Sequence, residues 1–156
     1  MTRTFAFTVA GIPGPQGSKN NYGRGRTVES SKKVGPWREA VKCAALQTIG
    51  LRHGPERPWQ PFDGPLSLTA VFWLPRPASA PKKRWAPSTR PDCSKLVRST
   101  EDALTDVAVW VDDARVVRIN ASKSYVGGWF DPAILEYGLR EPAHPGASLV
   151  ISEVTP

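Results

Sequence analysis

Proline and glycine break this chain into short segments, and they limit its regular structure more than any other feature. The 156 residues include 16 prolines and 13 glycines, and neither residue suits the interior of a helix or strand. Long loops are therefore expected, above all the basic, proline-rich loop 75–90 and the irregular segment 124–146. Regular structure is expected in the stretches between these breaks.

Those stretches contain four strand patterns and two helix patterns. Pro36 and Gly50 fit the start and the end of one helix, and residues 92–105 have the apolar stripe of a second. The strand patterns share apolar runs or period-two alternation and cover 4–10, 66–74, 114–126 and 147–154. The order β-α-β-α-β-β predicts one α+β domain over residues 1–156, a two-layer fold with two helices packed on a mixed β-sheet.

The segment after the first strand, "GIPGPQGSKNNYGRGR", predicts a loop without regular structure. It lacks the Gly-Lys-Ser/Thr ending of a nucleotide-binding loop, so no nucleotide cofactor is expected. Its glycines are interpreted as positions where the backbone approaches a neighbour closely. Lys19, Arg24 and Arg26 make the loop basic.

Charge is distributed unevenly along the chain. Residues 1–98 carry 17 basic and 5 acidic side chains, and residues 99–156 carry 4 basic and 9 acidic ones, for a net charge of +7. This asymmetry, with a pI near 9.8, favours a polyanionic partner, most simply nucleic acid. A solvated basic surface remains the alternative.

Several other classes of protein are not expected. No apolar run reaches the length of a membrane helix, and the first residues do not follow the plan of a signal peptide. Cys43 and Cys93 form neither a disulfide framework nor a zinc motif, and His53 and His144 are interpreted as isolated surface residues. A cytoplasmic protein with no membrane contact is expected.

Three carboxylates stand out in this basic sequence. Asp92 begins the second predicted helix, and Asp112 and Asp113 precede the following strand. Taken singly, Asp92 has a structural explanation as a helix cap, and the pair has one as a turn. If this strand pairs with residues 66–74, however, the helix start and strand start can converge at one end of the sheet.

Converging aspartates suggest a metal site. Their oxygens are the hard ligands that Mg²⁺ or Mn²⁺ requires. Within a cationic surface, such a site suits phosphodiester hydrolysis, because the metal activates water and stabilises the leaving oxygen while basic residues hold the backbone.

The stretch "RPDCSKLVRSTEDALTDVAVWVDDARVV" resembles the signature of RusA-type Holliday junction resolvases, P-D-x-D-[NK]-L-x-[KR], then D-A-L-[TN], then W-x-D-D-x-x-V. The spacing fits without a gap, and the resemblance extends more loosely to both ends of the chain. The matching residues are Pro91, Asp92, Lys95, Leu96, Arg98, residues 102–105, Trp110, Asp112, Asp113 and Val116.

The resemblance implies a homodimeric, Mg²⁺-dependent endonuclease that nicks four-way DNA junctions in recombination and repair. Many members are encoded by phages or prophages of bacterial hosts. Asp92 and Asp113 match metal-binding carboxylates of the family, and Asp112 matches a neighbouring acidic position. Arg98 matches a lysine that acts on DNA or on the scissile phosphate, and Lys95 falls at an Asn/Lys position.

Ser94 departs from the family pattern, because it stands where the second aspartate of P-D-x-D is expected. A hydroxyl is a poorer ligand than a carboxylate, although it could hold a metal-bound water. Asp102 is interpreted as structural, in an i, i+4 pair with Arg98.

DNA contacts are expected from basic residues in the loops and at the helix start. Two alternatives stay open: a protein that binds branched or single-stranded DNA without cutting it, and a basic structural protein of a virus particle. The expected phosphate contacts are Lys19, Arg24, Arg26, Lys82, Lys83, Arg84 and Lys95.

Overall fold

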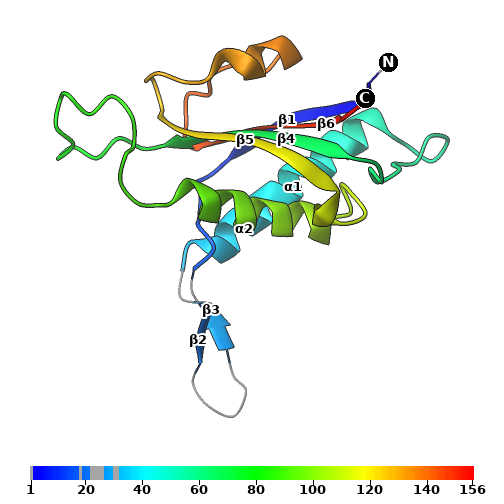
Figure 1. Ribbon diagram of the computed structural model, residues 1–156, viewed down its shortest axis with the longest axis horizontal. Coiled ribbons are helices and arrows are strands. Elements are labelled where there is room, and N and C mark those ends of the chain that lie inside the picture. The colour runs from blue at the N-terminus through cyan, green and yellow to red at the C-terminus, as the bar shows by residue number, and fades with distance from the viewer. Residues whose placement is uncertain (1, 18, 22–26, 30–31) are drawn as a thin grey trace.

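The computed structural model describes residues 2–17, 19–21, 27–29 and 32–156. Two long helices cover one face of a four-stranded sheet, and a short helix lies on the other face (Figure 1). The elements are β1 Thr4–Ala10, β2 Lys19–Asn21, β3 Thr27–Glu29, α1 Val34–Arg52, β4 Leu66–Leu74, α2 Cys93–Asp106, η1 Asp113–Arg115, β5 Val116–Tyr125, η2 Pro132–Tyr137 and β6 Gly146–Glu153. The predicted α+β fold, with two helices on a mixed sheet, is confirmed.

The sheet has the strand order β1-β6-β4-β5. β6 pairs antiparallel with β1 and β4, whereas β4 and β5 are parallel. β4 is an inner strand and almost entirely buried, which explains its near-continuous apolar sequence. Because β4 and β5 are parallel, the chain must cross from the end of one to the start of the other, and α2 lies within that crossover.

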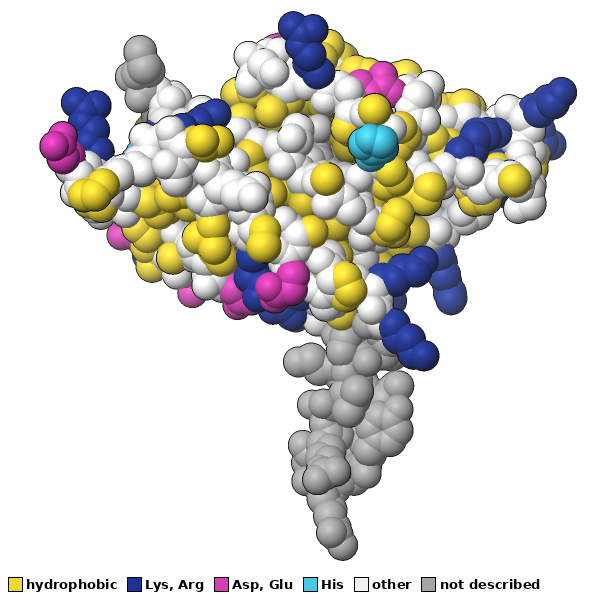
Figure 2. All heavy atoms as spheres, turned by 180° about the vertical axis from the view of Figure 1, so that it is seen from behind, with side chains coloured by type: hydrophobic (Ala, Val, Ile, Leu, Met, Phe, Trp, Pro, Cys, Tyr) yellow, Lys and Arg dark blue, Asp and Glu magenta, His cyan; other side chains and the backbone are white. Residues whose placement is uncertain are grey.

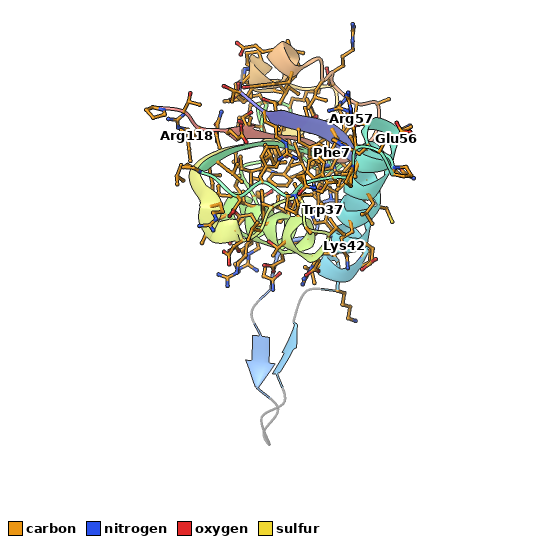
Figure 3. All side chains as sticks on the ribbon, turned by 90° about the vertical axis from the view of Figure 1, so that its right-hand side faces the viewer. Phe7, Trp37, Lys42, Glu56, Arg57 and Arg118 are labelled. Atoms are coloured by element: carbon orange, nitrogen blue, oxygen red, sulfur yellow. The ribbon has the colours of Figure 1, made fainter. Side chains whose placement is uncertain are left out.

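The main core fills the space between the sheet and the two long helices. Phe7 of β1 and Trp37 of α1 both point into this layer, whereas Lys42 of α1 lies on the outside (Figure 3). The indole of Trp37 donates a hydrogen bond of 3.1 Å to the Thr100 hydroxyl on α2, so the two helices are joined by a polar contact inside an apolar layer. Satisfying the indole N–H in this way removes the cost of burying it.

Gly14 confirms the expectation of a close backbone approach. A Cβ atom there would lie 2.2 Å from the Lys33 carbonyl oxygen, a distance that no side chain can tolerate. The Gly14 carbonyl also accepts a hydrogen bond of 2.6 Å from the buried Ser99 hydroxyl of α2. The segment after β1 is therefore fixed against both helices before it reaches β2.

Three details differ from the sequence-based predictions. The segment after β1 was expected to lack regular structure, but β2 and β3 form a two-stranded antiparallel ribbon apart from the sheet (Figure 1). Such a ribbon depends on backbone pairing, so its polar sequence gives no apolar alternation to detect. The first helix begins at Val34 and continues past Gly50 to Arg52, because packing outweighs the modest helix penalty of glycine. The third predicted strand starts at Val116, after η1.

Candidate active site

A groove lies between α2 and the edge strand β5, and we call it the α2–β5 groove. Ser94, Arg98 and Glu101 follow one another at i, i+4 and i+7, so they share one side of the helix. The opposite side of α2 buries Leu96 and Leu104 in the core. The residues that line the groove are Cys93, Ser94, Val97, Arg98, Glu101, Asp102, Asp113, Ile119 and Ala121.

The two adjacent aspartates before β5 have different environments. The Asp112 carboxylate caps η1 and accepts a hydrogen bond of 2.7 Å from the Ala114 N–H. Asp113 is the next residue, and its side chain lines the α2–β5 groove. The structural interpretation therefore accounts for Asp112, while Asp113 remains available for chemistry.

Glu101 is the site residue that the sequence analysis missed. The pKa of Glu101 is raised to about 7, mainly by burial and also by the charges of Asp113 and Asp102, while the Arg98 charge opposes the rise. Glu101 and Asp113 are thus two carboxylates that repel each other across one groove, and a cation between them would relieve the repulsion. The sequence signal was the spacing of Glu101, seven residues after Ser94.

Arg98 does not have the partner that was expected. Among the described residues, the ion pairs within 4.0 Å include none between Arg98 and Asp102, and Asp102 instead lies 4.0 Å from Arg38 Nη1 of α1. Asp106 also pairs with Arg38, at 3.2 Å. Asp102 and Asp106 are therefore paired with α1. The exposed Arg98 side chain, without Asp102 as its partner, lines the α2–β5 groove.

Asp92 occupies the N-cap position of α2, yet its side chain makes no capping hydrogen bond. The carboxylate is 55% exposed and lies 3.9 Å from the Lys95 ammonium. Asp92 and Lys95 line a second hollow, beside the α2–β5 groove, together with Lys33 and Arg90. The capping explanation for Asp92 is therefore wrong for its side chain, which is free to meet a ligand.

The predicted convergence of the helix start and the strand start is met only in part, because Cys93 and Ser94 line the α2–β5 groove with Asp113, whereas Asp92 lines the adjoining hollow. The Lys123 ammonium donates hydrogen bonds to the carbonyls of Thr89 and Pro91, just before α2. The start of α2 therefore lies beside the carboxyl end of β5, and Val116 is seven residues away, about 23 Å of strand. Asp92 and Asp113 line different hollows, because α2 is the crossover between two parallel strands.

A metal site can be assessed against this geometry. Within residues 2–17, 19–21, 27–29 and 32–156, no three His, Cys, Asp or Glu residues are grouped closely enough to hold a metal ion. Mg²⁺, however, is commonly bound through only one or two carboxylates, with water and substrate phosphate completing its shell. Glu101 and Asp113 fit that pattern, since both offer hard oxygens to one groove.

Cys93 also lines the groove, but its chemistry is different. Burial raises the pKa of the Cys93 thiol, and the nearby Lys123 charge opposes this only in part. A half-buried thiol with a raised pKa is a poor nucleophile, so Cys93 is interpreted as part of the groove wall.

The basic residues expected to contact DNA fall into three groups. Lys82 and Lys83 are exposed on loop 75–90, and Arg84 is partly exposed there. Lys95 is at the start of α2, beside Asp92. Figure 2 shows Lys and Arg side chains gathered at the end of the molecule that holds this loop. Lys19 is described only as part of the β2 backbone, and Arg24 and Arg26 lie outside the described residues.

An arginine and two carboxylates along one groove, with lysines and arginines near its end, are the groups that an enzyme acting on a phosphodiester backbone needs. The family model for endodeoxyribonuclease RusA matches residues 11–128. The chain therefore belongs to the RusA family of endodeoxyribonucleases. No curated protein matches the sequence significantly. Within the described residues, no helix combines the length and the apolar character needed to span a bilayer.

Proposed function

We propose that this protein is a metal-dependent endonuclease that nicks four-way DNA junctions. The observation that carries the proposal is that Arg98, Glu101 and Asp113 line one groove of a chain in the RusA family. Arg98 holds the scissile phosphate beside the two carboxylates, because a guanidinium can donate two parallel hydrogen bonds to phosphate oxygens. The exposed lysines of loop 75–90 hold the backbone on one side of the cut.

Glu101 and Asp113 are the proposed ligands of the cation, which we take to be Mg²⁺, with Mn²⁺ as a substitute. When bound, the cation activates water and neutralises charge at the leaving oxygen. Glu101 supplies a carboxylate on the side of α2 where Ser94 lacks one. Asp92, from the adjoining hollow, is proposed to act on the same DNA strand. Asp112 remains part of the motif, but its capping bond argues against a direct role.

A homodimer is the proposed assembly. A four-way junction has near-twofold symmetry, and two copies of the groove related by a dyad can nick opposing strands. Light scattering tests this assembly directly. A monomer that still makes paired nicks at working concentration would contradict it.

The proposed function is tested on a synthetic four-way junction and a linear duplex of the same sequence, each with Mg²⁺, Mn²⁺ or EDTA. Nicks in the junction that depend on the metal, with little cutting of the duplex, are expected. Junction binding without nicks in any divalent cation would instead support the second candidate.

That second candidate is a protein that binds branched DNA without cutting it. Two observations favour it: the serine at position 94 and the absence, within the described part of the chain, of a three-ligand metal cluster. The comparison of Mg²⁺, Mn²⁺ and EDTA separates the two candidates, because only an endonuclease forms nicked DNA when the cation is present.

A further inference from the structure

Two tryptophans meet on the surface although 43 intervening residues separate them in the chain. The rings of Trp85 and Trp129 are nearly perpendicular, at 89°, with centroids 5.5 Å apart. Even so, Trp85 is 64% exposed and Trp129 is 55% exposed. Most of each ring therefore remains in water, although a tryptophan gains much by burial.

The topology brings the two rings together. Trp85 belongs to the loop that follows β4, and Trp129 to the segment that follows β5. Because β4 and β5 are parallel, both segments leave the sheet at the same end, where the carboxyl ends of the two strands lie. Gly128 keeps the turn after β5 tight, since a Cβ atom there would lie only 3.2 Å from the Tyr125 carbonyl oxygen.

The loop is held in place before any partner arrives. The Arg76 guanidinium donates hydrogen bonds of 2.7 Å and 2.6 Å to the carbonyls of Pro81 and Arg84. It also lies 5.0 Å from the centre of the Tyr125 ring. Trp85 thus directly follows a segment that Arg76 holds in a fixed position. A ligand that stacks on Trp85 therefore loses little free energy in ordering the loop.

The charge around the rings identifies the kind of partner. Residues 75–90 carry five basic side chains and no acidic one. The segment after β5 carries carboxylates that are already engaged: Glu141 accepts a hydrogen bond from the Gly127 N–H, and Asp131 caps η2. We call the surface formed by Lys82, Lys83, Arg84, Trp85 and Trp129 the tryptophan surface. Its cations suit phosphates, and its open rings suit bases.

We propose that Trp85 and Trp129 stack on bases that have lost a stacking neighbour at the branch point of the DNA, while the adjacent cations hold the phosphates. This inference rests on the proposed function and adds to it a means of selecting branched DNA. Stacking on aromatic side chains accepts any base, because every base has a flat face. In a continuous duplex those faces are covered, so the tryptophan surface distinguishes branched DNA by shape rather than by sequence.

The test compares Trp85→Ala, Trp129→Ala and the double variant with Trp85→Phe, which keeps a flat ring. Leu51→Ala is the matched control, because Leu51 is 88% exposed at the end of α1. Affinity is measured for a junction that carries 2-aminopurine at the branch point and for a duplex of the same sequence. We expect each Ala variant to lose on the order of tenfold in junction affinity and little in duplex affinity.

Trp85→Phe and Leu51→Ala are expected to bind both DNAs as wild type does, and 2-aminopurine fluorescence should respond to wild type but not to the double variant. Equal losses on junction and duplex, or no loss on either, would overturn the inference. So would a change of oligomeric state in the double variant, which would assign the rings to contact with a second copy. Junction nicking by the wild type at saturating DNA is scored separately. If wild type cuts junctions and the tryptophan variants bind them normally, this inference fails and the proposed function stands.

Discussion

The α2–β5 groove and the tryptophan surface are built in different ways. The groove takes its chemical groups from one helix and one turn, at spacings that the helix fixes. The tryptophan surface takes its groups from two loops that meet only because two strands are parallel. Groups on a helix are held within the small tolerances that catalysis needs. Loops carry exposed, adaptable contacts that suit binding. We therefore expect the groove to control cleavage and the tryptophan surface to control affinity.

The largest expected effect is the loss of cleavage in Asp113→Asn. Removing groups that merely orient metal ligands costs about 10- to 100-fold, so removing a ligand should cost more than about 100-fold. Junction binding should be retained or become tighter, because a negative charge near phosphate is lost. Initial nicking rates and a gel-shift titration measure the two properties. Asp106→Asn is the control, since Asp106 is paired with Arg38 and Lys42.

Asp92→Asn tests the separation of the two aspartates. The family motif predicts that this variant also abolishes nicking. The geometry predicts a smaller loss than in Asp113→Asn, because Asp92 is nine residues from Glu101, about 13 Å of helix. Nicking rates measured over a range of Mg²⁺ concentrations decide between the two. An equal loss with the same weakening of metal dependence would mean that DNA binding brings Asp92 to the same cation.

A triple Ala variant of Lys82, Lys83 and Arg84 is expected to show the opposite effects from the aspartate variants, with weaker DNA binding and little change in cleavage. Junction and duplex affinity should both fall, and the salt slope should decrease by about one unit per lost phosphate contact. The rate of nicking at saturating DNA should change little. Arg57→Ala serves as the control, because Arg57 belongs to the connection between α1 and β4, at the opposite end of the molecule from loop 75–90 (Figure 1). An unchanged salt slope would identify the cluster as a solvated loop.

The sequence was most informative where one kind of local pattern dominates. β1 and β4 lie at their predicted residues because apolar alternation and an apolar run between prolines leave few alternatives. Arg98 and Asp113 were found through motif spacing, and the structure brings both to one groove. Glu101 was missed because an acid on a helix surface usually has no function. The role that we propose for Glu101 depends on Asp113, which η1 brings to the same groove.

The errors have a common cause, which is that local patterns do not encode the path of the chain. The aspartates before α2 and before β5 were expected to form one site, whereas the crossover leaves them in two adjoining hollows. The contact of Trp85 with Trp129 likewise depends on strand order. Asp102 was assigned to Arg98 from helical spacing, whereas α1 provides Arg38 as its partner. Long-range packing therefore decided each of these outcomes.

Ser94→Asp tests the chemistry of the groove with a smaller expected effect. Ser94 shares its side of α2 with Arg98 and Glu101, so an aspartate there adds a carboxylate to the same groove. We expect a several-fold tighter apparent Mg²⁺ affinity, measured by titrating Mg²⁺ against the nicking rate. Ser94→Ala should reduce cleavage only modestly. Weaker metal affinity in Ser94→Asp would show that Glu101 already occupies the position that the new carboxylate needs.

The smallest expected effect concerns stability, and it tests whether Glu101 is held ready for a cation. The pKa of Glu101 is raised to about 7 from its ordinary 4.5, so the folded state binds this proton more tightly than the unfolded state. The resulting stabilisation is complete below pH 4.5 and is lost as the pH rises to about 7. Glu101→Gln removes the charge that opposes folding. Because the side chain is partly exposed and screened by solvent, we expect the variant to be more stable than wild type by only about 1 kcal/mol at pH 8, with little difference at pH 4. Urea unfolding of the metal-free protein measures both values.

Mg²⁺ should then stabilise wild type at pH 8 and leave Glu101→Gln almost unchanged, because a cation that binds only the folded state shifts the equilibrium toward it. Equal stabilisation of both proteins by Mg²⁺ would mean that the cation binds elsewhere and that Glu101 is only a carboxylate in an unfavourable environment.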